Sequence, residues 1–327
     1  MKTKTIIKVL IGFVLFLSAC QKNTDIFVPD PGQPNGPDTA WYNVVTATMP
    51  VSILKSNITI ATHHDSIIAG SNIASVITPG GLQLNFPPNA CINNLGQIIT
   101  GKIDVEVLVV KTKGDMIRLN KPTTSDNRLL VSGGEIFINL KKNGLSVQLA
   151  PGIKYNIRYS DGVPNPLMEL FVGDETNTEK FNWIPNPDTA NNKLFIGSQS
   201  YEIYTNHLRW LNCDYFYDTA GIPRITVAAE LPTYFTNANT VAFTVFKDIR
   251  SVVGMYGNVN TRKFSTGKLP AGKAITVVVI SKQANDYYLG YESAVTLTTT
   301  TGNPLQPVPV KPIKKSLPDI IHYLSTL

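Results

Sequence analysis

The side chains that most often carry out chemistry are sparse in this sequence of 327 residues. It contains four histidines, and charged residues make up 16% of it. A nucleophilic hydrolase needs a serine or cysteine beside a base, and no Gly-x-Ser-x-Gly segment occurs. Asp104 and Glu106 stand two apart in an alternating run, which places both on the solvent side of a predicted strand. We therefore predict a protein without catalytic activity, and a hydrolase assembled from distant residues is the alternative.

The sequence predicts neither a metal site nor a cofactor. His63 and His64 are adjacent, so in a strand-like stretch they would point to opposite faces, and we expect them in a solvated loop or hairpin. Asp174, Glu175 and Asp188 carry suitable oxygens for calcium but lack the spacing of an EF-hand. The sequence also contains no phosphate loop and no dinucleotide fingerprint.

One cysteine near the amino terminus lies in a sequence pattern that indicates covalent modification. Lys2, Lys4 and Lys8 precede an apolar stretch that is too short to span a bilayer and ends in Leu-Ser-Ala-Cys20. This ending resembles the lipobox of bacterial lipoproteins, in which the cysteine thiol receives a diacylglyceryl group. We predict a lipoprotein signal peptide over residues 1–19, lipidation at Cys20 and attachment to a membrane through this amino-terminal lipid.

The residues after Cys20 predict where the folded part is held. Residues 20–40 are rich in proline and glycine, which indicates a solvated tether. Gln21 follows the cysteine, so no aspartate marks retention at an inner membrane. We predict a protein of the cell envelope, anchored in the outer membrane, and whether it faces the periplasm or the outside stays open.

Residues 41–160 are predicted to form a first β-sandwich. Alternating apolar residues run through 82–86, 103–109, 136–140 and 145–149, separated by glycine and proline turns. Asn143-Gly144 between two of these runs is a strong hairpin signal. We also expect residues 41–77 to be strand-like and residues 111–129 to form a long polar connection.

A family resemblance rests on six short segments, of which all but the last lie in this region. They are Gly80-Gly81, Leu82 to Ala90, Thr100 to Val105, Ser132 to Glu135, Lys113 to Met116 and Trp210 to Asp214. Over about residues 75–160 the chain resembles the ZU-five type of β-sandwich found in ankyrins, netrin receptors and zonula-occludens proteins. It is more similar still to uncharacterised lipoproteins of Bacteroidota that carry such a domain. The resemblance implies a fold and carries no catalytic residues.

An aromatic-rich segment follows at residues 161–221, and we expect it to be an irregular connection. Two interpretations of its rings stay open: they form a core that joins two domains, or they form a platform that binds a sugar or a peptide. If they bind a ligand, the candidate residues are Trp183, Tyr204, Trp210 and Tyr215.

The rest of the chain predicts a second β domain and a short helix. Residues 222–302 contain short apolar strands typical of an immunoglobulin-like or transthyretin-like sandwich, with a continuous apolar run at 274–280. Residues 303–327 begin as a proline-rich strap. Ser316 can then cap a helix whose Leu317, Ile320 and Leu324 share one face.

The sequence thus predicts an all-β, lipid-anchored binding or structural module with two β-sandwich domains. No cluster of basic and aromatic residues indicates nucleic-acid binding. The partner is an envelope protein or a glycan, and one alternative is a glycan-binding accessory of a polysaccharide-uptake system. The other alternative is an envelope hydrolase. Cys91 and Cys213 are expected as buried free thiols, with a disulfide as the alternative.

Overall fold

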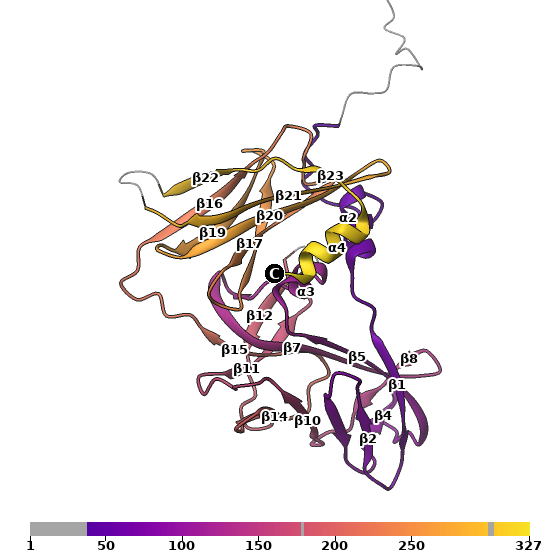
Figure 1. Ribbon diagram of the computed structural model, residues 1–327. Helices are drawn as coiled ribbons and strands as arrows, with labels where there is room; N and C mark the ends of the chain where they lie inside the picture. Colours follow the sequence, from indigo (N-terminus) through magenta and orange to yellow (C-terminus); the bar gives the residue numbers. More distant parts are fainter. Residues whose placement is uncertain (1–37, 178–179, 300–303) are drawn as a thin grey trace, which may run out of the picture. The chain divides into compact units, whose positions relative to one another are not determined.

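The computed structural model describes residues 38–177, 180–299 and 304–327. Residues 39–327 form one compact unit, in which β-strands dominate, so the prediction of an all-β, sandwich-like fold is confirmed (Figure 1). The predicted signal peptide, Cys20 and most of the predicted tether lie outside the described residues. None of the helices in the described ranges is long and apolar enough to cross a membrane.

The first sheet of the amino-terminal sandwich is built around β7, which is 15 residues long. Its path across the sheet is β1 (His63–Ala69), β5 (Gly101–Val110), β7 (Arg128–Lys142), β15 (Arg209–Phe216), β11 (Glu169–Asp174) and β12 (Asn182–Pro185), with the short β6 (Thr124–Ser125) and β8 (Leu145–Ser146) beside β7. All of these neighbours are antiparallel.

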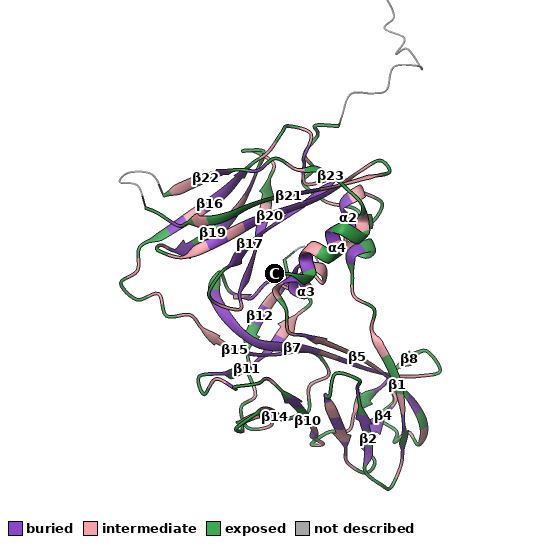
Figure 2. Cartoon of the chain, viewed as in Figure 1, coloured by how far each residue is buried: buried purple, intermediate pink, exposed green. Residues whose placement is uncertain are grey.

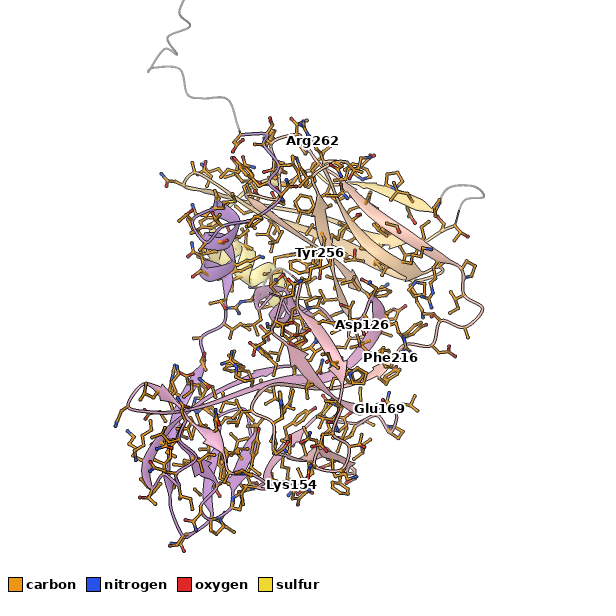
Figure 3. The ribbon with its side chains drawn as sticks, turned by 180° about the vertical axis from the view of Figure 1, so that it is seen from behind. Asp126, Lys154, Glu169, Phe216, Tyr256 and Arg262 are labelled. Carbon is orange, nitrogen blue, oxygen red and sulfur yellow. The ribbon has the colours of Figure 1, made fainter. Side chains whose placement is uncertain are left out.

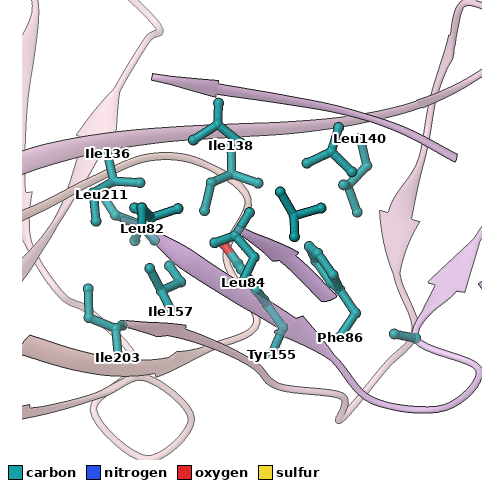
Figure 4. Packing of buried hydrophobic residues seen from close by; sticks show 14 of the residues in the cluster. Leu82, Leu84, Phe86, Ile136, Ile138, Leu140, Tyr155, Ile157, Ile203 and Leu211 are labelled. Carbon is teal, nitrogen blue, oxygen red and sulfur yellow. The ribbon is translucent and has the colours of Figure 1, made fainter. Parts of the chain in front are cut away.

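A five-stranded sheet forms the second layer of this sandwich. Its order is β13 (Lys193–Ile196), β14 (Ser200–Thr205), β10 (Tyr155–Ser160), β3 (Gln83–Phe86) and β2 (Ala74–Ile77). A separate two-stranded ladder joins β4 (Cys91–Ile92) to β9 (Gln148–Leu149). The first core lies between the two layers, where Leu84, Phe86 and Ile138 interdigitate as the alternation predicted (Figure 4).

The segment at residues 161–221 is not an irregular connection, and that prediction is wrong. It forms β11 to β15, and β15 pairs with β7 from Arg209↔Ile138 to Phe216↔Leu130. These strands were hard to recognise because they are short, and because the apolar residues of β15 face two different cores. Leu211 faces the first core and Trp210 faces another core, described below.

The carboxyl-terminal half forms one eight-stranded sheet that folds over its own core. Its order is β22 (Leu305–Pro309), β16 (Arg224–Glu230), β19 (Lys263–Pro270), β18 (Val252–Asn258), β17 (Thr240–Phe246), β20 (Ala274–Gln283), β21 (Asp286–Thr296) and β23 (Ile313–Lys315). Strand β20 is central and buried, as its apolar run predicted (Figure 2). The proline-rich strap adds two edge strands, with β22 parallel to β16.

In the described ranges three short helices pack between the two halves, and the sequence predicted only the one at the carboxyl terminus. The predicted helix α4 (Leu317–Ser325) is present, and the Ser316 side chain accepts a hydrogen bond from the Asp319 backbone NH. Helix α2 (Pro50–Ile58) begins at a proline and buries Val51, Leu54 and Ile58. It replaces part of the strand-like stretch expected over residues 41–77. Helix α3 (Lys113–Arg118) lies in the expected polar connection.

A core of helix and aromatic residues joins the two halves of the unit. It contains Leu54 of α2, Met116 of α3 and Leu324 of α4, together with Trp183 and Trp210 of the first sheet. From the other half it receives residues of β17, β18, β20 and β21: Val241, Phe243, Val245, Val252, Val278, Ile280 and Leu289. We call this cluster the joining core.

Helices α3 and α4 touch at a glycine. A Cβ atom placed on Gly114 would lie 1.8 Å from the carbonyl oxygen of Leu324. Only a residue without a side chain therefore allows α4 to lie against α3 at this distance.

We predict that Gly114→Ala destabilises the protein by about 1–3 kcal/mol, the usual cost of forcing extra atoms into a packed contact. Urea unfolding followed by tryptophan fluorescence measures this change. Gly70→Ala is the matched control, because a Cβ at Gly70 meets no atom within 4 Å. Equal unfolding midpoints for the two variants would contradict the close helix contact.

Candidate functional site

The solvent-facing side of the five-stranded sheet carries two rows of side chains, all polar or aromatic except Ile77. The strand registers place Lys193, Tyr204, Asn156, Asn85 and Ser75 in one row, and Phe195, Glu202, Arg158, Gln83 and Ile77 in the next. Alternate residues of the same strands point into the first core, which is why these ten face outward. We call this surface the polar face.

Hydrogen bonds link the side chains of the polar face across four strands. Ser75 Oγ donates to Asn85 Oδ1 at 2.8 Å, and Asn85 Nδ2 donates to Asn156 Oδ1 at 3.1 Å. Asn156 Nδ2 donates to Glu202 Oε1 at 3.0 Å. Tyr204 donates its hydroxyl proton to the same carboxylate oxygen at 2.9 Å. These bonds hold the amide and carboxylate groups in fixed positions on a rigid sheet.

Two exposed rings lie at the β13–β14 edge of this face. Tyr204 is 39% exposed and Phe195 is 55% exposed. Their ring centres are 5.8 Å apart, at an interplanar angle of 87°. The hydrogen bond to Glu202 raises the pKa of the Tyr204 hydroxyl, because loss of the proton would break this bond to the carboxylate. The edge therefore offers apolar ring faces next to fixed hydrogen-bonding groups.

The polar face can bind a ligand rich in hydroxyl groups. A hydroxyl both donates and accepts hydrogen bonds, and the amides of Asn85 and Asn156 provide both partners within one row. Arg158 and Glu202, paired across β10 and β14, add charged groups that form stronger hydrogen bonds than neutral ones. The exposed rings of Tyr204 and Phe195 supply flat apolar surface for the C–H face of a sugar ring.

The four aromatic residues that the sequence proposed as ligand contacts are not brought together. Trp183 and Trp210 are buried in the joining core, with ring centres 6.3 Å apart, so no ligand reaches them. Trp183 Nε1 donates to the backbone oxygen of Pro122 at 3.1 Å. Tyr215 is half-buried against the first core. Tyr204 alone of the four is exposed.

Sequence reasoning missed the other members of the polar face. Asn85 and Gln83 were recognised only as the polar half of an alternating strand, and Asn156, Glu202 and Phe195 were not singled out. The signal that could have found them is the pairing of β14 with β10, which joins residues 46 apart in the chain. A single sequence does not reveal such a register.

Two buried carboxylates, Glu135 and Asp214, lie on the first sheet, on the side that faces the joining core. Glu135 is fully buried, and neither of its oxygens has a hydrogen-bond partner among the described residues. Burial, with a further contribution from Asp214, raises the pKa of Glu135 well above its usual range. Burial likewise raises the pKa of Asp214, whose Oδ2 accepts a hydrogen bond from Asn212 Nδ2 at 2.7 Å. Neither carboxylate lies on the polar face.

Glu106 and Asp104, which the sequence analysis placed on the solvent side of a predicted strand, have different surroundings in the structure. Glu106 accepts hydrogen bonds from Lys141 Nζ and Asn139 Nδ2, each at 2.7 Å, and these bonds, the Lys141 bond foremost, lower its pKa. Asp104 is exposed and lies 3.9 Å from Lys102 Nζ. His63 and His64 belong to strand β1 and are not in a loop. In the described ranges, no group of three or more His, Cys, Asp or Glu residues could hold a metal ion.

Cys91 and Cys213 are both free and buried. Burial raises the pKa of the Cys91 thiol to about 11 and that of Cys213 to about 12. A thiol must lose its proton to act as a nucleophile, so both are unreactive at neutral pH.

Comparison with known proteins does not assign this chain to a family. No family model matches the chain, and no curated protein matches it. The resemblance to the ZU-five module and to lipoproteins of Bacteroidota therefore stays a prediction.

We predict that Glu135→Gln changes how stability depends on pH. A raised pKa means that the folded state favours the protonated carboxyl, whereas the unfolded chain releases this proton above about pH 4.3. The wild type therefore loses stability relative to the variant as pH rises from that value toward the folded pKa. The loss is about 1.4 kcal/mol per pH unit within the window.

Urea unfolding at pH 4 and pH 7 measures this difference. The free energy of unfolding of Glu135→Gln should increase relative to that of the wild type between pH 4 and pH 7. The free energy of unfolding of Glu169→Gln, on the exposed side of β11, should not. The same pH dependence in wild type and Glu135→Gln would show that Glu135 is not held as a buried acid.

Proposed function

We propose that this protein is a lipid-anchored, non-catalytic binding module of the bacterial cell envelope, and that its polar face binds a glycan. The observation that carries the proposal is the hydrogen-bonded row from Ser75 to Tyr204, flanked by the exposed rings of Tyr204 and Phe195. Fixed amides and a carboxylate beside aromatic rings suit a ligand with many hydroxyl groups and apolar ring faces.

The proposed location of the protein is the outer membrane, to which a lipid on Cys20 would attach it. Its support is the sequence Leu-Ser-Ala-Cys20 at the end of a short apolar segment. The proline- and glycine-rich residues that follow would hold the sandwich unit away from the membrane surface. A binding module held in this way can meet polysaccharides or other envelope components without leaving the cell.

Metabolic labelling with a palmitate analogue tests the anchor. We expect the wild-type protein to carry the label and Cys20→Ala to lack it, because the variant has no thiol at the lipobox. Phase partitioning in detergent gives a second measure, since the unmodified variant should move to the aqueous phase. Equal labelling of the two proteins would remove the anchor from the proposal.

A glycan array probed with the purified full-length protein tests the ligand. We expect binding to a subset of polysaccharides, and we expect Tyr204→Ala and Asn156→Ala each to weaken it at least about tenfold by removing a ring contact or a hydrogen-bonding amide. Tyr291→Ala is the matched control, because Tyr291 is also an exposed tyrosine (52%) but lies on β21.

Melting curves separate loss of binding from loss of fold. Tyr204 is on the surface, so its truncation should leave stability within about 0.5 kcal/mol of the wild type. Glycan binding that survives both Tyr204→Ala and Asn156→Ala would move the site away from the polar face. No binding to any glycan would favour the alternative of a structural module.

A further inference from the structure

Two cations of the polar face have no partner in the described ranges, and this feature narrows the class of glycan that the face can bind. Arg158 lies at the centre of one row, on β10, and Lys193 lies in the other row, on the edge strand β13. Both side chains are exposed. Among the described residues neither forms a side-chain hydrogen bond or an ion pair. The face therefore presents two positive charges that a ligand can neutralise.

The acidic residue that pairs with Arg158 in the sheet is engaged elsewhere. Glu202 lies opposite Arg158 across β14 and β10. Its Oε1 accepts hydrogen bonds from Asn156 Nδ2 at 3.0 Å and from the Tyr204 hydroxyl at 2.9 Å. Asn156 and Tyr204 both belong to the other row, so these bonds draw the carboxylate toward that row and leave Arg158 without an acceptor. Among the ten residues of the polar face Glu202 is the one acid, so their net charge is positive.

The exposed rings lie between the two cations. Lys193 is directly opposite Tyr204, whose ring lies against that of Phe195. Arg158 is two strands away from Phe195 in the same row, a separation of about 10 Å. A long arginine side chain covers much of this separation. A sugar ring resting on the two aromatic residues therefore has its substituents within reach of a cation on either side.

We propose that the glycan bound by the polar face is an acidic one, whose sugar rings carry carboxylates as uronic acids do, and that Arg158 selects for the carboxylate. This inference rests on the proposed function of the polar face. The guanidinium group of Arg158 forms two parallel hydrogen bonds with the carboxylate, a geometry that the hydroxymethyl group of a neutral sugar does not match. Lys193 meets a second carboxylate as a point charge.

Calorimetric titration of the full-length protein in lipid nanodiscs tests the charge, with empty nanodiscs as the blank. The probes are oligomers of galacturonate, mannuronate and guluronate, each as the free acid and as its methyl ester, and neutral oligomers of galactose, mannose and glucose. An ester keeps every hydroxyl group but has no negative charge. We expect at least one acid to bind, and its ester to bind about tenfold more weakly or less.

Polyglutamate separates sugar recognition from general attraction of anions. It carries carboxylates without sugar rings, so the exposed rings of Tyr204 and Phe195 gain no stacking partner. We expect it to bind at least about tenfold more weakly than the acidic oligomer.

Variants locate the carboxylate. Arg158→Gln should weaken binding of the acid about tenfold or more and leave binding of the ester unchanged. Lys193→Gln should also weaken binding of the acid, and it keeps the test valid if Arg158→Gln fails to fold. Arg262→Gln is the matched control. Arg262 is an exposed arginine, and Figure 3 shows it at the opposite end of the unit from Lys154, the residue that precedes β10.

The outcomes separate this inference from the proposed function. Binding of neutral oligomers alone, or equal binding of an acid and its ester, would overturn the inference and leave a glycan site in place. Equal binding of polyglutamate, or unchanged binding of the acid in Lys193→Gln and in a folded Arg158→Gln, would also overturn it. No binding of any oligomer would remove the glycan site itself, and the inference with it.

Discussion

Burial of apolar surface between the amino-terminal sandwich and the carboxyl-terminal sheet is the constraint on which the rest of this structure depends. Strand β7 contributes residues to all three cores. Leu129 lies in the core of the carboxyl-terminal half, Leu130 in the joining core, and Ile136 and Ile138 in the first core. Backbone hydrogen bonds reinforce this arrangement where Ser132 NH donates to the Arg250 oxygen at 3.0 Å. A strand shared by three cores cannot shift its register without exposing apolar side chains in each of them.

The joining core also explains why polar groups are buried beside it. Glu135 stands on the side of β7 that faces the joining core, between Val110 and Asn212 in the sheet, and helices and aromatic rings exclude water from that side. Burying its carboxyl costs free energy. The free energy gained by burying apolar surface in the same contact offsets this cost. Among the described residues no other layer covers the outer side of the five-stranded sheet, and the proposed glycan site lies on that face.

The fold was predictable where its signals are local and was not where they are long-range. Alternation in residues 82–86 and 103–109 and the cap at Ser316 each depend on neighbouring residues, and each element is present. The pairing of β15 with β7 joins residues about 80 apart, and no local pattern encodes it. The same limit applies to the candidate site. Tyr204 was recognised as an aromatic residue, but its exposure and its bond to Glu202 follow from the registers of β13, β14 and β10.

If the joining core unites the two halves, they must unfold together. Scanning calorimetry of the full-length protein tests this most directly. We expect one transition whose calorimetric enthalpy equals the van't Hoff enthalpy, and we expect Trp210→Ala to move the whole transition to lower temperature. Two separate transitions, of which Trp210→Ala shifts only the one that belongs to the amino-terminal sandwich, would contradict it.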